Sequence, residues 1–69
     1  MVAYAQAVVH SEDMKRNQDF ETGRALWTEY QSVNGYAFRP TDAGLKNLSR
    51  RLDLNIAYLR KMINLFLEA

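Results

Sequence analysis

Residues 45–64 read LKNLSRRLDLNIAYLRKMIN, and this stretch decides what kind of fold the chain can adopt. Apolar side chains recur at helical spacing on both sides of a short interruption, Asp53-Leu54-Asn55. They are Leu45, Leu48 and Leu52 before it, and Ile56, Leu59, Met62, Ile63 and Phe66 after it. Thr41 and Asn55 are residue types that cap helix starts, and each precedes one of these runs. The stretch therefore predicts two helices joined by a turn.

In its pattern this stretch resembles the helix-turn-helix of bacterial and phage repressors and small regulators. Two helices that cross at a short turn need apolar contacts between them, which we expect from Leu48, Leu52, Leu54, Leu59 and Met62. Ser49 is the small residue expected where the second helix approaches the first. Asp53 stands where the family usually has glycine in a left-handed conformation, which aspartate adopts more readily than most residues. An unrelated helical hairpin with the same leucine spacing is the alternative interpretation.

The resemblance implies that the exposed face of the second helix enters the major groove of DNA. The side chains that could then contact bases are Asn55, Ala57, Tyr58, Arg60, Lys61 and Asn64, with Arg60 the first choice. The side chains that could contact backbone phosphates are Arg39, Lys46, Arg50 and Arg51. Without DNA, Arg50 and Arg51 would instead complement the dipole of their own helix, and Tyr58 would pack across the surface.

The residues before this stretch predict at least one more helix. Apolar positions step by three and four from about residue 19 to 33; Asp19 or Thr22 could cap the start, and Asn34-Gly35 is the stop. The sequence leaves open whether this helix reaches back through Met14 to Glu12. Residues 36–40 alternate and end in a proline, so we expect them to be extended. Residues 1–10 suit either a helix or a short arm. The prediction is one all-α domain over residues 1–69, with the helix-turn-helix at about 42–67.

Two apolar segments predict contact with another chain. Leu65, Phe66 and Leu67 are consecutive, and one helix face cannot bury all three within a single chain. The segment Val2–Val9 adds a second apolar surface. Because small proteins rarely expose such patches, we expect a homodimer or a contact with a different protein.

The composition excludes several classes of function. The chain has 69 residues, no cysteine and one histidine, His10, which rules out disulfides, thiolate metal sites and a histidine zinc site. We expect no enzymatic activity, no catalytic residue, no cofactor and no metal. No apolar run approaches the roughly 20 residues of a membrane span. We therefore expect a cytoplasmic protein, associated with the nucleoid if it binds DNA.

The distribution of charge and the spacing of two aromatic residues add to this prediction. Residues 1–38 carry three basic and five acidic side chains, and residues 39–69 carry six basic and three acidic ones. The basic C-terminal half favours a polyanionic partner, although a solvated helix face would look similar. The helical spacing of Trp27 and Tyr30 favours burial in the core over a role as a platform on which bases stack.

The leading interpretation is a small prokaryotic or phage regulator of transcription, a repressor or accessory factor, that binds double-stranded DNA. The alternative is a helical protein-interaction module, such as an inhibitor or antirepressor. Such a module would bind its partner through the apolar C-terminal end and would need no DNA.

Overall fold

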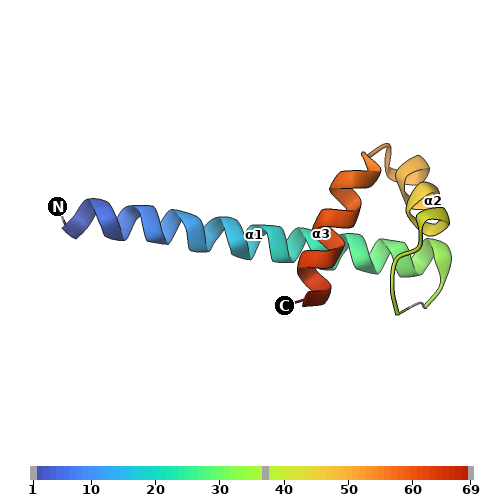
Figure 1. Ribbon diagram of the computed structural model, residues 1–69, viewed down its shortest axis with the longest axis horizontal. Coiled ribbons are helices and arrows are strands. Elements are labelled where there is room, and N and C mark those ends of the chain that lie inside the picture. The colour runs from blue at the N-terminus through green and yellow to red at the C-terminus, as the bar shows by residue number, and fades with distance from the viewer. Residues whose placement is uncertain (1, 37, 69) are drawn as a thin grey trace.

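Three helices make up the computed structural model, which describes residues 2–36 and 38–68, with side chains described from Met14 onward (Figure 1). Helix α1 runs from Val2 to Asn34, α2 from Asp42 to Leu52, and α3 from Ile56 to Glu68. The described residues contain no strand. The prediction of an all-α fold is confirmed.

Helix α1 is a single helix of 33 residues, so neither Asp19 nor Thr22 caps its start, and the helix extends back past Glu12. The sequence from Val2 to Thr22 contains neither glycine nor proline, and nothing in it interrupts a helix. The predicted stop is confirmed, because Gly35 has a left-handed backbone (φ 84°) and donates its N–H to the carbonyl oxygen of Gln31 at 2.9 Å.

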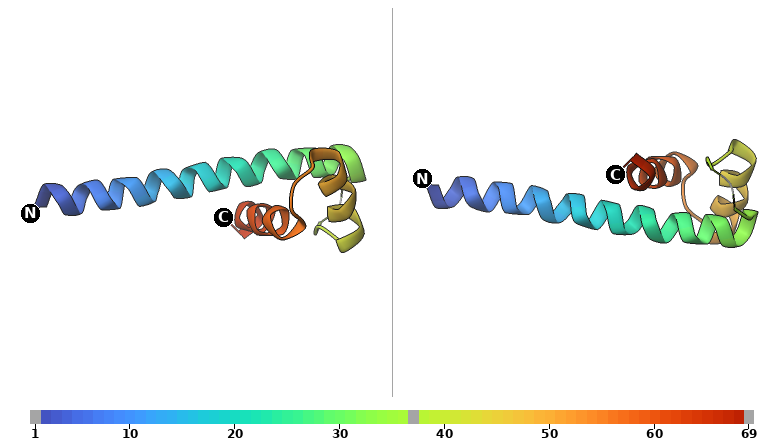
Figure 2. Two further views of the ribbon diagram at one scale, coloured as in Figure 1. Left: turned by 90° about the horizontal axis from the view of Figure 1, so that it is seen from above. Right: turned by 90° about the horizontal axis from the view of Figure 1, so that it is seen from below.

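Helices α2 and α3 both pack on the C-terminal half of α1, whereas its N-terminal half projects beyond them (Figures 1 and 2). This projection makes the molecule 49 Å long but only 22 and 15 Å in its other dimensions. The buried core comprises Leu26, Tyr30, Leu45, Leu48, Leu59, Met62 and Ile63. Trp27, Val33, Leu52 and Ile56 pack against its edge. The stripes predicted from residues 45–64 therefore do face a common core.

Two glycines allow α1 to approach the other helices closely. A Cβ atom on Gly23 would overlap the carbonyl oxygen of Met62, so α3 lies directly against the backbone of α1 at this point. A Cβ atom on Gly44 would likewise overlap the ring and hydroxyl of Tyr30. Glycine inside a helix lowers its stability by roughly 0.5–1 kcal/mol, and these close contacts account for its presence.

Tyr30 joins α1 to the start of α2. Its ring is buried and stacks on Trp27, with the ring centroids 5.3 Å apart, so its predicted place in the core is confirmed. Its hydroxyl oxygen accepts the backbone N–H of Thr41 at 3.0 Å. Thr41 in turn caps α2, as predicted, by accepting the N–H of Gly44 at 3.1 Å. Asn34 adds a second link, since its amide donates to the carbonyl oxygen of Gly44 at 3.0 Å.

The segment between α1 and α2 bends at Tyr36, Phe38 and Arg39, so the prediction of an extended segment over residues 36–40 is wrong there. The chain must turn within a few residues to bring Thr41 back to Tyr30. Tyr36 and Phe38 are 93% and 101% exposed.

Candidate nucleic-acid interface

Asp53 ends α2 in the left-handed conformation that the sequence predicts (φ 54°, ψ 45°). The backbone N–H groups of Asp53 and Leu54 both point to the carbonyl oxygen of Ser49, the latter at 3.3 Å. The hydroxyl of Ser49 donates to the carbonyl oxygen of Leu54 at 2.5 Å. Ser49 therefore holds the turn through hydrogen bonds, a function beyond the small size for which the sequence singles it out.

Leu54, expected between the two helices, is 38% exposed and is not part of the buried core. The turn fixes its backbone against Ser49. Leu48, Leu59 and Met62 are buried as predicted. These residues belong to a core that both helices share with α1.

Asn55 caps α3, as predicted. Its side-chain oxygen accepts the backbone N–H of Ala57 at 2.7 Å, and its carbonyl oxygen accepts the N–H of Leu59 at 3.0 Å. The side-chain oxygen of Asn55 is thus engaged at the helix start, where it fixes the first turn of α3.

The other residues expected to contact bases all lie on the exposed surface of α3. They are Ala57, Tyr58, Arg60, Lys61 and Asn64. Tyr58 is 42% exposed. The structure therefore brings these five side chains to one solvent-facing side of a single helix, opposite the buried Leu59, Met62 and Ile63.

Arg60 forms an ion pair with Asp42 in the first turn of α2. Both side chains are largely exposed, so this pair contributes little to stability. Its main effect is electrostatic, because Asp42 partly neutralises the cation at the centre of the candidate interface. Sequence spacing gave no signal for this contact, since the two residues are 18 positions apart in different helices.

The cations expected to contact phosphates divide into two groups. Lys46 and Arg50 are exposed on α2. Arg39 is exposed in the segment before α2. Arg51 instead faces α1, where its Nε lies 3.3 Å from a carboxylate oxygen of Glu29. The structure therefore brings Arg39 beside α3 and turns Arg51 toward α1, and it leaves Lys46 and Arg50 exposed on α2.

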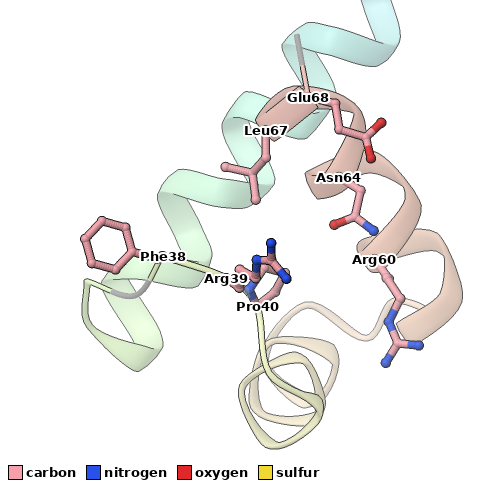
Figure 3. Close-up of a pocket in the computed structure, with 7 residues that line it drawn as sticks. All are labelled: Phe38, Arg39, Pro40, Arg60, Asn64, Leu67 and Glu68. Atoms are coloured by element: carbon pink, nitrogen blue, oxygen red, sulfur yellow. The ribbon is translucent and has the colours of Figure 1, made fainter.

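An open hollow of about 550 Å³ lies between the segment before α2 and the side of α3 (Figure 3). Arg39 and Pro40 line one wall, and Arg60, Asn64, Leu67 and Glu68 line the other, with Phe38 at the rim. Glu68 contributes a carboxylate to the same hollow, at the other end of α3 from Arg60. The hollow therefore combines two arginines with an acidic group.

The three consecutive apolar residues near the end of α3 are divided between two environments. Phe66 is half-buried and packs against Phe20 of α1, with ring centroids 5.4 Å apart. Leu65 and Leu67 are each 39% exposed. Phe66 is thus already part of an intramolecular contact, and the exposed apolar surface consists of its two neighbours.

In the part of the chain that the structure describes, no group of three acidic, histidine or cysteine side chains could hold a metal ion. Over the described residues, no helix is both long and apolar enough to cross a membrane. Comparison of the chain with family models, curated proteins and solved structures gives no match.

Proposed function

We propose that this chain is a small DNA-binding regulator of transcription that reads duplex DNA through α2, the turn and α3. The observation that carries this proposal is the three-residue turn with left-handed Asp53, followed by a capped helix with a polar, basic exposed face. A helix placed in this way fits the major groove, as in helix-turn-helix proteins. The protein would act as a homodimer on the cytoplasmic nucleoid, as a repressor or accessory factor of prokaryotic or phage type.

The exposed residues take distinct roles in this proposal. Arg60, Lys61 and Asn64 reach base edges, with Ala57 and Tyr58 in apolar contact beside them. Arg39, Lys46 and Arg50 neutralise backbone phosphates and set the position of α3. Arg60 and Asp42 form an ion pair in the free protein, so Arg60 must leave Asp42 before it can contact DNA.

A salt titration of binding to a random-sequence duplex, followed by fluorescence anisotropy, tests the proposal. Each phosphate contact contributes a slope of about −0.9 in a plot of log affinity against log salt, so three contacts per subunit of a dimer give about −5. Arg50→Gln should reduce the slope by about two in the dimer. Arg24→Gln is the matched control, because Arg24 lies exposed on α1 beside Glu21, away from this surface. Absence of binding to any duplex at low salt contradicts the proposal.

A second candidate function is a protein-interaction module, and one observation favours it. The exposed Tyr36 and Phe38, together with Trp27, Gln31 and Leu67, line a mostly apolar hollow of about 430 Å³. Aromatic side chains of this kind are enriched at protein interfaces. If the chain binds no duplex, this aromatic surface and Leu67 become the leading binding site.

A further inference from the structure

Two hollows on the surface of the molecule border each other, because Phe38 and Leu67 line both of them. One is the mostly apolar hollow of about 430 Å³, and the other is the hollow of about 550 Å³ beside α3 (Figure 3). Both volumes lie within the range of small-molecule sites, roughly 300–1,000 Å³. We define the aromatic–arginine surface by the residues Trp27, Tyr36, Phe38, Arg39 and Leu67.

The apolar part of this surface is built from aromatic rings. Trp27 is held in place because its ring stacks on that of the buried Tyr30. Tyr36 and Phe38 are almost completely exposed, and among the described residues neither ring contacts another ring. A flat apolar molecule can stack against rings of this kind. The surface therefore suits a ligand with a flat, apolar body.

Arg39 supplies the positive charge of this surface. It is exposed and takes part in none of the ion pairs among the described residues. It also follows Phe38 directly in the chain, so a guanidinium and an aromatic ring belong to neighbouring residues. A guanidinium binds a carboxylate or phosphate through two parallel hydrogen bonds. A ligand that matches this surface therefore carries an acidic group.

The number of charges favours a small anion over a strand of nucleic acid. Arg60 on the facing wall is already paired with Asp42, and Glu68 adds a negative charge to the same hollow. A strand of nucleic acid would bring several phosphates and would require a row of cations along a groove. One arginine without an ion-pair partner matches one acidic group.

We propose that the aromatic–arginine surface binds a small organic anion, whose flat apolar body lies against the three aromatic side chains and whose acidic group pairs with Arg39. This function goes beyond the proposed binding of duplex DNA and does not depend on it. It also differs from a protein-interaction module, because the ligand is a small molecule. Arg60 and Asn64 line the same hollow, so the bound anion would lie beside the side of α3 that is proposed to read bases.

Two dyes with the same rings test this proposal on the full chain without DNA. Anilinonaphthalene sulfonate has a flat apolar body and one acidic group, whereas N-phenylnaphthylamine has the same body and no acidic group. The fluorescence of both dyes rises in an apolar environment, so a titration gives the affinity of each. The parent chain should bind both dyes, with one molecule of the sulfonate per chain.

Three variants separate the contributions of charge and stacking. Arg39→Gln should weaken binding of the sulfonate dye at least about threefold and leave the neutral dye unchanged, because it removes only the charge. Phe38→Ala should weaken both dyes by a similar factor, since both lose the same ring. Lys15→Gln is the matched control, because it removes a positive charge from an exposed position on the projecting half of α1. It should change neither affinity, and circular dichroism should show the helix content of the parent in all three variants.

The opposite results overturn the proposal. A parent chain that binds neither dye has no such site. If Arg39→Gln and Lys15→Gln weaken the sulfonate dye equally, net charge is responsible, and if Phe38→Ala changes neither affinity, the dyes bind elsewhere. A parent dimer that Phe38→Ala dissociates in sedimentation velocity would show that a second copy covers this surface. Because no DNA is present, absence of duplex binding in the salt titration would leave these results unaffected.

Discussion

At the scale of single residues, Gly23 is the position with the least room for change. Its hydrogen stands where any side chain would overlap the backbone of Met62, and backbone cannot move aside as a flexible side chain can. The helix interior would otherwise favour alanine by about 1 kcal/mol. The close approach of α3 to α1 therefore outweighs the local helix preference.

We expect Gly23→Ala to lower the free energy of unfolding by about 1–3 kcal/mol, because α3 must move away from α1 to admit the methyl group. Urea unfolding followed by circular dichroism measures this change. Arg24→Ala, at the exposed neighbouring position, should stay within about 0.5 kcal/mol of the parent. A stabilised Gly23→Ala protein would show that helix propensity dominates here and that α3 does not press on this residue.

At Asp53 the reverse holds: a glycine would suit the backbone conformation better than the aspartate that is present. A left-handed conformation is unfavourable for residues with a Cβ atom, and glycine adopts it freely. We expect Asp53→Gly to raise the free energy of unfolding by up to about 1 kcal/mol. Asp53→Val should lower it, because a β-branched side chain tolerates this conformation least. Thermal unfolding of both variants provides the test, and equal midpoints would argue against the left-handed turn.

At the scale of elements, the ion pair between α2 and α3 sets the charge of the candidate interface. Asp42 lies in the first turn of α2, where a carboxylate is favourable for the helix dipole, and it also holds Arg60. Both contributions to stability are small at an exposed site. In the proposed DNA complex the carboxylate would have a larger effect, because it would repel phosphates and pair with the arginine that is expected to contact DNA.

Asp42→Asn should therefore tighten binding to a random duplex by about threefold at low salt, and the gain should fade as salt rises. Anisotropy titrations at two salt concentrations measure it. Glu21→Gln is the matched control, since it removes one negative charge from an exposed position on α1. Equal tightening by both variants would mean that net charge alone is responsible.

Base reading by α3 can be separated from phosphate contacts made by α2. Arg60→Ala should cost roughly 1–3 kcal/mol on a selected DNA site and much less on scrambled DNA. Arg50→Ala should weaken both by a similar factor, because phosphates carry no sequence information. Paired affinity measurements on both DNAs decide the matter. If Arg60→Ala lowers both affinities equally, α3 does not read bases, and Lys61 and Asn64 lose their proposed roles with it.

At the scale of the whole molecule, seven residues form the described core of a 69-residue chain, and half of the longest helix lies outside it. A core of this size supplies only roughly 3–5 kcal/mol. Association into the proposed homodimer would add stability that depends on concentration, because mass action would favour the folded dimer.

The midpoint of thermal unfolding should therefore rise with protein concentration for the parent chain. Scanning calorimetry over a hundredfold range of concentration measures this, and a constant midpoint for the parent would contradict a stabilising dimer.

Local rules were sufficient for most of the helical framework. The spacing of Leu45, Leu48, Leu59 and Met62 determined the buried stripes, and Thr41, Asn55, Asp53 and Gly35 determined where helices begin and end. These features depend on residues close together in the sequence, as when a side chain accepts a hydrogen bond from a backbone N–H group at the start of its own helix. They can therefore be predicted from the sequence. The start of α1 could not be placed in this way, because the charged residues between Glu12 and Asp19 interrupt the apolar spacing, although nothing there prevents a helix.

Tertiary structure alone decided which surface groups meet. The pairing of Arg60 with Asp42 and of Arg51 with Glu29 joins different helices, and no local spacing encodes such contacts. The same holds for Phe66 on Phe20, which removed one of three apolar residues from the exposed surface. Where α3 crosses α1 depends on the glycine that lets the two backbones approach. Sequence thus determined the helices and their buried faces, whereas the packing of the three helices determined which charged side chains pair, because only the assembled fold sets distances between remote residues.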